Sequence, residues 1–588
     1  MNTRKYMFKN SLVACFACCC ISFASAGNPP FFPTDVVTNA EGELLMTDKG
    51  VKRVDVFSPD GKTLLRSFPM DEAPTGILVD GDKAYVTTFG TTGHLQILSL
   101  ESGRVEASIP TGSGACHPMF GPDKKHIYVC NQFQTTISEI DPVARKVMRT
   151  VKVLREPKSA VFSKDGKYMF VTNFLPAQRA DLDYVAACVS VIEMDGFTKV
   201  KDIQLANGSN ALRGICITPD GKYIYVSHNL GRFTVPTSQL QQGWMNTSAF
   251  SVIDADKQEF LGAIEPERGA AGIWSIACND ESVFISHSGT HEVSVIDHKA
   301  MLEKFLNYPN KAVLDYDLTF LYGLRERIPL EGNGPRNMIL AGDKLIIPTY
   351  FADVLNIMDV NTNEVTSVEL NPGREETAEN KGERYFNDAS HCFQNWQSCN
   401  GCHPGDARTD GMNWDLMNDG VGNSKNCKSM LFSHVTPPNM ISGIREHAER
   451  AVRAGFNFIQ FYDVTEEDAV CVDAYLKSLR PVPSPYLVNG ELSDLAKEGQ
   501  KVFEKLKCGE CHSGVYYTDM KYHRIGEDIE FEKGWDTPTL REVWRTAPYL
   551  FDGRAATMKD VFSVHKHGIE KKVSEKDIEA LTEYVNSL

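Results

Sequence analysis

Two short motifs in the C-terminal third of the chain place cysteine and histidine side chains where they could hold one group together. In each motif two cysteines are separated by two residues, and a histidine directly follows the second cysteine. This spacing lets both thiols form thioethers with the vinyl groups of a haem while the histidine binds the iron. We therefore predict two covalently attached haem c groups. Their attachment and axial residues are Cys399, Cys402 and His403 for haem 1, and Cys508, Cys511 and His512 for haem 2.

The same residue types also build redox-active Cys-x-x-Cys pairs and zinc sites, which are the alternatives to haem. Cysteines outside the motifs could form disulfides in an oxidising compartment. Five of them lie in expected strands, where buried free thiols are common. Cys392 and Cys427 bracket the first motif and are the favoured pair, although spacing alone gives no connectivity.

The first 26 residues have the three parts of a secretory signal. A positive end precedes an apolar run at 12–23 and a small-residue cleavage site. A membrane anchor is the alternative, but this run is shorter than the roughly 20 residues that cross a bilayer, and no later segment is long and apolar enough. We predict cleavage and a mature protein in the periplasm or a similar exported space, with no membrane span. The signal residues are Arg4, Lys5, Lys9, Ala24, Ser25 and Ala26.

Size and charge limit the remaining possibilities. A chain of 588 residues with 42% apolar residues is long enough for two or more domains with large cores. Its formal net charge of -16, without a clustered basic stretch, disfavours nucleic acid as a partner.

A sequence repeat runs between about residues 35 and 370, on the N-terminal side of the two Cys-x-x-Cys-His motifs. A short apolar strand, a Pro-Asp-Gly type turn, an aromatic-valine strand and a strand ending in Ile-Asp recur every 40 to 55 residues. Seven copies of a four-stranded unit predict a seven-bladed β-propeller over 27–375. The second strands lie at 44–47, 84–87, 127–130, 169–173, 224–227, 283–286 and 345–348. The phrase at 170–173 resembles the Tyr-Val-Thr-Asn repeats of bacterial propellers.

Superposed repeats place two sets of polar residues at equivalent positions near the propeller axis. Two interpretations stay open: each residue caps its own blade, which we favour, or one end of the funnel is basic and binds an anion or a metal. The funnel candidates are Lys158, Arg213, Trp274 and Arg336 at the entry of the inner strands, and His228 and His287 at the ends of the next strands, where Asn131 and Asn173 stand in other blades.

Three- and four-residue apolar spacing predicts helices around both motifs, at 446–454, 467–479, 494–506 and 575–587. A proline-rich stretch at 481–485 separates two mainly α-helical cytochrome c domains in tandem, at 376–485 and 486–588.

The segments 536–541 and 547–557 closely resemble the bacterial diheme cytochrome c peroxidase family, including the MauG-type enzymes that oxidise protein tryptophans. The resemblance covers about residues 385–588. It implies that haem 1, held by His403, reacts with peroxide and that haem 2, held by His512, is a six-coordinate partner. Its sixth ligand would be His565, with His567 as the alternative. Family members often hold calcium between the haem domains, but no Asp-rich loop marks such a site here.

Around haem 1 the chain departs from the family, because segment 428–446 lacks the expected tryptophan. Electron transfer would then use other aromatic residues, and peroxide cleavage would need an acid or base over the open iron face. The relay candidates are Trp396, Trp414 and Phe551, and the acid-base candidates are His434, Glu446 and Glu449.

The leading prediction is therefore an oxidoreductase that uses hydrogen peroxide or oxygen at haem 1. Its electron donor would be a small redox protein, or a protein or peptide substrate, with the propeller as docking module. The alternative is a non-catalytic diheme electron carrier or redox sensor in which both haems are six-coordinate. A third interpretation makes the propeller the catalyst on a small substrate, with the basic funnel as its support.

Overall fold

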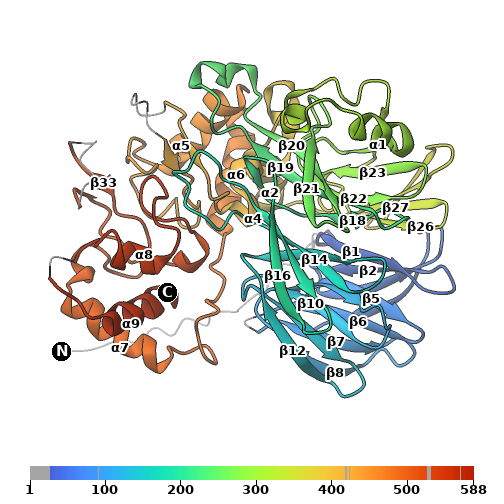
Figure 1. The fold of residues 1–588 in the computed structure, drawn as a ribbon, viewed down its shortest axis with the longest axis horizontal. Coiled ribbons are helices and arrows are strands. Elements are labelled where there is room, and N and C mark those ends of the chain that lie inside the picture. Colours follow the sequence, from blue (N-terminus) through green and yellow to red (C-terminus); the bar gives the residue numbers. More distant parts are fainter. Residues whose placement is uncertain are drawn as a thin grey trace, which may run out of the picture.

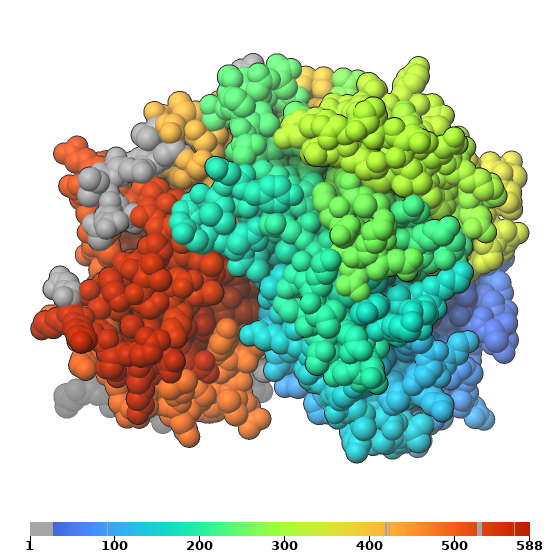
Figure 2. All heavy atoms as spheres, in the orientation of Figure 1, coloured from blue at the N-terminus to red at the C-terminus, as the bar shows by residue number. Residues whose placement is uncertain are grey.

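The structure is a computed structural model that describes residues 27–90, 92–417, 420, 422, 424–525, 532–569 and 571–588. Strands of the N-terminal two thirds form a ring of seven sheets, and the C-terminal third consists of short helices joined by long loops (Figure 1). The C-terminal third lies against one side of the ring (Figure 2). The predicted signal at 1–26 lies outside the described residues. Within the described ranges, no helix has the length and apolar character needed to cross a membrane.

The seven sheets confirm the predicted propeller, and each contains strands that are consecutive in the chain. Blade 1 comprises β1 (Pro33–Thr38), β2 (Leu44–Asp48), β3 (Arg53–Phe57) and β4 (Leu64–Pro69). Blade 2 comprises β5 (Ala73–Asp80), β6 (Lys83–Phe89), β7 (His94–Ser99) and β8 (Val105–Pro110). Blade 3 comprises β9 (Ala115–Phe120), β10 (Ile127–Asn131), β11 (Thr136–Asp141) and β12 (Lys146–Lys152). Blade 4 comprises β13 (Pro157–Phe162), β14 (Tyr168–Asn173), β15 (Cys188–Glu193) and β16 (Thr198–Gln204). Blade 5 comprises β17 (Ser209–Asn210), β18 (Ile215–Ile217), β19 (Tyr223–Gly231), β20 (Asn246–Asp254) and β21 (Glu259–Ile264). Blade 6 comprises β22 (Ile273–Cys278), β23 (Ser282–His287), β24 (Glu292–Asp297) and β25 (Arg325–Pro329), and blade 7 comprises β26 (Ile339–Ala341), β27 (Lys344–Pro348), β28 (Val354–Asp359) and β29 (Val365–Glu369).

Burial along each blade explains its sequence pattern. The second strands β2 and β10 are buried at every position, so they need continuous apolar runs. The outermost strands β4 and β8 expose most of their residues and tolerate charge. Gly166 and Gly221 occupy left-handed backbone conformations, with φ of 70° and 82°, in the turns that join the first two strands of their blades.

Hydrogen bonds from side chains to backbone carbonyls join each blade to the next around the axis. The last bond joins blade 7 to blade 1 and closes the ring. In the part of the chain that the structure describes, blade 1 and blade 7 exchange no strand. The donors and acceptors are Thr34 and Pro74, Thr75 and Ala115, Cys116 and Lys158, Ser159 and Arg213, Ser227 and Trp274, Ser286 and Arg336, and Asn337 and Thr34.

The C-terminal third contains two similar halves, which we name module 1 (residues 378–478) and module 2 (residues 494–586). The four expected helices are present, and their ends differ from expectation by no more than two residues. Module 1 contains α2 (Ala378–Asn387), η3 (Ala389–His391), η4 (Phe393–Asn395), α3 (Cys399–Cys402), α4 (Pro404–Ala407), β30 (Asn413–Trp414), β31 (Lys425–Asn426), α5 (Ala448–Gly455), η5 (Phe456–Gln460) and α6 (Glu466–Ser478). Module 2 contains α7 (Asp494–Lys505), η6 (Cys508–Glu510), β32 (Tyr522–His523), β33 (Trp535–Asp536), η7 (Val543–Arg545), α8 (Met558–Ser563) and α9 (Glu575–Asn586); the propeller adds η1 (Thr237–Gln242), α1 (His298–Leu306) and η2 (Lys311–Tyr316).

In each module the first helix crosses the last at a glycine. A Cβ atom on Gly382 of α2 would lie 1.9 Å from the Cys471 carbonyl oxygen of α6. A Cβ atom on Gly499 of α7 would lie 1.9 Å from the Ala580 carbonyl oxygen of α9. No side chain fits at these distances, so both crossings require glycine.

The two modules also meet through equivalent contacts. Residues 426–448 of module 1 match residues 536–558 of module 2 at a constant offset of 110 positions, with positive φ angles and a glycine at the same places. Asn426 N donates to Phe551 O at 2.7 Å, and Asp536 N donates to Ile441 O at 3.3 Å. Because each of these bonds is the other with the modules exchanged, the modules are related by an approximate two-fold axis.

Both modules dock on the propeller. Module 2 contacts blade 4, where Arg155 donates to the carbonyl oxygen of Ala547 at 2.8 Å. The Trp544 ring packs edge-on against Phe133 of blade 3, with centroids 5.6 Å apart. Module 1 contacts blade 5, where Asn246 Nδ2 lies 3.5 Å from the Cys402 sulfur. The first motif is therefore enclosed by the propeller as well as by its own module.

The favoured disulfide between Cys392 and Cys427 is wrong in this structure, because both thiols are free. The Cys427 thiol donates to the Cys402 carbonyl oxygen at 3.1 Å and lies 3.5 Å from His403 Nδ1. Cys392 is buried and contacts the Phe393 carbonyl oxygen. The two sulfurs thus have separate local partners on the chain around the first motif.

Candidate haem sites

The two motif histidines are held in the same way. His403 Nδ1 lies 3.0 Å from the Arg408 carbonyl oxygen, and His512 Nδ1 lies 3.1 Å from the Tyr517 carbonyl oxygen. A carbonyl can only accept, so each Nδ1 carries the proton and donates. Burial lowers the pKa of both histidines, which favours the neutral ring. Nε2 is then left with a lone pair for a metal, as required of an axial ligand.

A second histidine faces the motif histidine in module 2. The rings of His512 and His567 have centroids 6.3 Å apart and planes at 50°. Two metal–nitrogen bonds of about 2 Å each, plus the half-widths of two imidazole rings, span about this distance. Burial and the nearby His512 lower the pKa of His567 to about 4, which keeps it neutral. The geometry favours His567, the alternative in the sequence, over His565 as the second axial residue, and it fits a haem held between two histidines.

Module 1 has no histidine at the matching position. At the offset of 110, Asn457 corresponds in sequence to His567, but Asn457 lies in η5, whereas His567 lies beyond the end of α8 and follows Lys566, which has a φ of 51°. Asn457 lines a pocket of about 430 Å3 on the surface of module 1, together with Glu446, one of the acid-base candidates. The other lining residues are Ile444, Arg445, Arg450, Arg453, Ala454 and Phe458. Arg445 and Arg450 make this pocket basic, while Arg453 pairs with Glu466 and Asp473. Module 2 has no arginine at the three matching positions Ala555, Asp560 and Ser563.

The other two acid-base candidates are engaged in ion pairs. The His434 side chain is 2% exposed, and its Nε2 lies 3.0 Å from Asp473 of α6, which also contacts Arg453. Glu449 pairs with Lys477 at 3.1 Å on the surface. The structure therefore does not bring the three candidates together around one reacting position, and only Glu446 lines the pocket.

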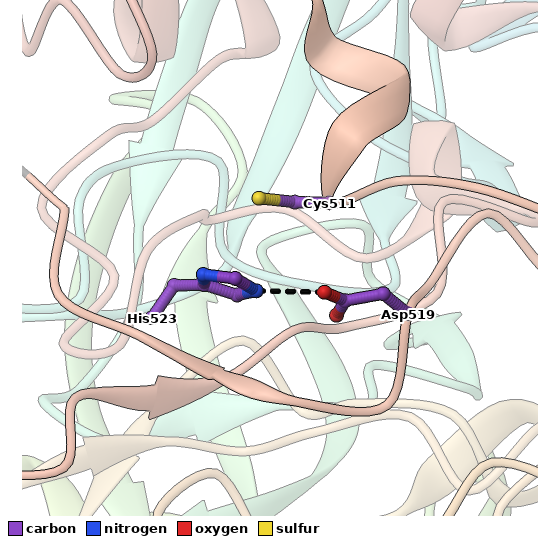
Figure 3. A group of neighbouring side chains, drawn as sticks. All are labelled: Cys511, Asp519 and His523. Atoms are coloured by element: carbon purple, nitrogen blue, oxygen red, sulfur yellow. Dashed lines mark hydrogen bonds and ion pairs between the residues drawn. The ribbon is translucent and has the colours of Figure 1, made fainter.

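An acidic residue and a ring partner flank the second cysteine of each motif. In module 2, His523 Nε2 lies 2.7 Å from Asp519 Oδ2, with the Cys511 sulfur beside them (Figure 3). In module 1, Trp414 Nε1 donates to Asp410 Oδ2 at 2.8 Å, beside Cys402.

Among the described residues, the cluster in module 2 is the single group of three side chains that could hold a metal ion, with ligand atoms within 4.8 Å of one another. A tryptophan occupies the equivalent place in module 1 and is no metal ligand. The feature that both modules share is therefore a carboxylate that is hydrogen-bonded to a ring side chain. A calcium ion between the haem domains stays a prediction.

The three relay candidates lie in different environments. Trp396 is buried against Gly243 of the propeller, and Trp414 packs against Gly231 of β19. Phe551 stacks on Trp535, with ring centroids 4.3 Å apart and planes at 12°. This stack lies where Phe551 and Asp536 bond to module 1, so it belongs to the contact between modules. Sequence reasoning missed Trp535, which the offset of 110 matches to Lys425.

A buried chain of polar side chains joins the propeller, module 2 and the first motif. It ends at Arg408, whose carbonyl oxygen accepts the proton of His403. Glu542 of module 2 is its centre and is 1% exposed. The contacts are Lys158 Nζ to Gln132 Oε1 (3.1 Å), Gln132 Nε2 to Glu156 Oε2 (2.8 Å), Arg545 Nε to Glu156 Oε1 (3.6 Å), Arg545 Nη1 to Glu542 Oε1 (3.5 Å) and Arg408 Nε to Glu542 Oε1 (2.7 Å).

The funnel histidines do not face the axis. His228 bonds to Ser251 Oγ at 2.8 Å, and His287 bonds to Ser294 Oγ at 2.7 Å. Both rings are fully buried, and burial lowers their pKa, that of His228 to about 4. Asn131 bonds to a serine in the third strand of its blade in the same way. These residues cap their blades, and the metal or anion interpretation of the two histidines is wrong.

Three of the other four funnel candidates lie together, whereas Lys158 bonds to Gln132. Trp274 lies between two guanidinium groups, at 4.6 Å from Arg213 and 4.3 Å from Arg336. Arg213 donates only to carbonyl and amide oxygens, including Ala211 O and Asn229 Oδ1. Burial and then the charge of Arg336 lower its pKa to about 9. The carboxylates of Glu383 and Asp406 interact with Arg336, so the basic funnel mouth stays a prediction.

Known proteins resemble parts of this chain, although no protein-family model matches it. It is 27% identical over 272 residues to hydrazine synthase subunit gamma of Kuenenia stuttgartiensis, which covers 35% of this chain and 76% of that subunit. It is 20% identical over 210 residues to cytochrome c551 peroxidase of Nitrosomonas europaea, which covers 30% of this chain and 60% of that protein. These similarities suggest a haem-related redox function.

Among solved structures, Kuenenia stuttgartiensis hydrazine synthase aligns with a TM-score of 0.51 at 19% identity, over 59% of this chain and 98% of the aligned chain. At this identity the match bears on the fold alone. It agrees with the seven-bladed propeller.

Proposed function

We propose that the chain is an exported oxidoreductase that carries two haem c groups with different roles. The contrast between His567, which faces His512, and Asn457 at the matching place in module 1 carries this proposal. Haem bound at the two motifs would supply electron transfer in module 2 and, with one free iron face, the activation of hydrogen peroxide or oxygen in module 1.

The chain's own residues would divide the remaining work. His403 and His512 would hold the iron atoms with rings fixed by backbone carbonyls. Glu446, at the edge of the basic pocket, is the acid-base candidate that a small substrate could reach. The Trp535–Phe551 stack would carry electrons between modules, because it lies at their contact.

A second candidate substrate class comes from the relative named hydrazine synthase subunit gamma, 76% of which is covered at 27% identity. This favours a small nitrogen compound related to hydrazine at the open site. The electron donor would be a small redox protein, or a protein or peptide substrate, that docks on the propeller. A non-catalytic electron carrier is the rival.

Electron-spin and optical spectra of the purified, haem-loaded protein test the proposal. One high-spin and one low-spin haem are expected, and only the high-spin signal should change when peroxide, hydroxylamine or nitric oxide is added. The compound that causes turnover identifies the substrate class. Two low-spin haems that ignore all three compounds would leave the electron carrier as the function.

A further inference from the structure

Two thiols outside the haem motifs meet between blades 5 and 6 of the propeller. The Cys216 sulfur of β18 lies 3.7 Å from the Cys278 sulfur of β22, although 62 positions separate the two residues in the chain. The Cys278 thiol also contacts the Ile217 carbonyl oxygen at 3.6 Å, so it points towards β18. Both cysteines are free in this structure. The two sulfurs are therefore already in van der Waals contact before any bond forms between them.

The inner strands that carry the two thiols lie close together. A Cβ atom on Gly214, which directly precedes β18, would lie 2.8 Å from the Ile276 backbone nitrogen and 2.8 Å from the Trp274 carbonyl oxygen of β22. Gly214 and Ile276 each stand two residues before a cysteine, so the sulfur contact continues this close approach along both strands. A disulfide requires such neighbouring backbones, because its two Cα atoms are usually about 4.4–6.8 Å apart.

The surroundings of the two thiols decide how fast they can react. Both are partly exposed, and both pack against a core to which blade 5 contributes Tyr225 and blade 6 contributes Ile276. The thiol of Cys278 and then burial raise the pKa of Cys216 well above its usual range. Because the thiolate is the form that attacks a disulfide, we expect this pair to oxidise slowly. Slow reaction is typical of a structural bond rather than of a catalytic dithiol.

We propose that Cys216 and Cys278 form a disulfide that joins blades 5 and 6 and stabilises the propeller. Closing the bond to about 2.05 Å brings the sulfurs about 1.7 Å nearer than they are here. The oxidant is itself a disulfide, such as oxidised glutathione or the active-site disulfide of a thiol oxidase. One thiolate attacks it and releases a first thiol, and the second thiolate then displaces the other. The cysteine pair loses two electrons and two protons, and the oxidant becomes two thiols.

The bond would join the two blades on which module 1 docks. Blade 5 contacts module 1 through Asn246 and the Cys402 sulfur. Blade 6 contacts it where the Ala389 backbone nitrogen donates to the Gly289 carbonyl oxygen at 2.9 Å. A covalent link limits the separation of these blades and restricts the unfolded chain, so it should stabilise the support of the first motif. This inference goes beyond the proposed function and depends on neither haem.

Peptide mapping of the full-length, haem-loaded protein tests the proposal. The protein is incubated with oxidised or with reduced glutathione, its remaining thiols are alkylated after unfolding, and its peptides are analysed by mass spectrometry. Oxidation should join the peptide that contains Cys216 to the one that contains Cys278, and dithiothreitol should separate them. Cys216→Ser should abolish the linked peptide. Cys188→Ser changes a partly exposed thiol of blade 4 and should keep it.

Unfolding in guanidinium measures the effect of the bond. The midpoint should rise on oxidation of the wild type and of Cys188→Ser, but not of Cys216→Ser. A wild-type protein without the linked peptide after oxidation would overturn the proposal, and so would a linked peptide without a rise in the midpoint. The map of the wild type decides the matter even if Cys216→Ser fails to fold. The spectra of both haems should stay unchanged throughout, so failure here is distinct from failure of the proposed function.

Discussion

Modules 1 and 2 share one scaffold but differ at the positions that surround the motifs. Both cross their terminal helices at a glycine, and both fix the motif histidine through a backbone carbonyl. The comparison teaches that the two modules keep the helix crossing and the support of the motif histidine, while the residues around the motifs differ. The divergent pairs, module 1 first, are Asn457 and His567, Trp414 and His523, Lys425 and Trp535, Ile441 and Phe551, and Phe432 and Glu542.

Removing His567 should produce the largest change, because it erases the main difference between the modules. His567→Ala leaves His512 without a facing ring, so haem 2 should change from low-spin to high-spin. Electron-spin spectra measure this directly. His565→Ala is the matched control and should keep the low-spin signal. If instead His565→Ala abolishes that signal and His567→Ala does not, His565 is the ligand and the assignment fails.

The opposite substitution, which adds a histidine to module 1, should make its iron site resemble that of module 2. Asn457→His places a histidine at the position that matches His567, and an added strong ligand should close the free iron face. We expect the high-spin signal to fall and the reaction with peroxide or a nitrogen compound to slow by about tenfold or more. Stopped-flow optical spectra record both effects. An unchanged rate together with a clearly altered spectrum would show that the reaction does not use this face.

The sequence predicted the features that depend on neighbouring residues and missed those that depend on contacts between distant residues. The repeat phrases and the helices around the motifs follow from local apolar spacing. The structure has the helices within two residues of expectation, whereas β19 of blade 5 runs four residues past the expected end. His567 could not be separated from His565 by spacing, because the choice depends on how the chain turns after α8. The chain of charges through Glu542 joins residues 386 positions apart, from Glu156 to Glu542, so no local pattern reveals it. The matching offset of 110 was present in the sequence and would have revealed Trp535.

Glu542 takes the place of Phe432 and ties the modules together, which suggests a test of stability. Glu542→Gln leaves the buried Arg408 guanidinium without a carboxylate partner and leaves Arg545 with Glu156, so we expect a loss of about 3 kcal/mol or more in the free energy of unfolding. Glu449→Gln removes a surface ion pair with Lys477 and should cost less than about 1 kcal/mol. Denaturant unfolding followed by fluorescence compares the two. Equal losses would mean that the buried chain of charges contributes no more than a surface pair.

A last comparison separates the two modules by pH. Burial raises the pKa of Asp410 to about 7, whereas for Asp519 the effect of burial is outweighed by hydrogen bonds from His523 and Thr537 and the pKa is lowered. A raised carboxyl pKa means that the folded state holds the proton more tightly than the unfolded state. Asp410 therefore contributes most to the free energy of unfolding below its ordinary pKa of 3.8, and this contribution is lost as the pH rises towards 7. Asp519 stabilises above 3.8, and its contribution is lost as the pH falls below that value.

Unfolding free energies measured from pH 3 to pH 8 therefore separate the two residues. Asp410→Asn should flatten the decline between pH 4 and 7, because an amide keeps one hydrogen-bonding form throughout. Asp519→Asn should leave that range unchanged and flatten the acid limb below about pH 4. If both variants alter the same limb, the two carboxylates share one environment, and the divergence of the modules does not extend to the residues beside the second cysteine of each motif.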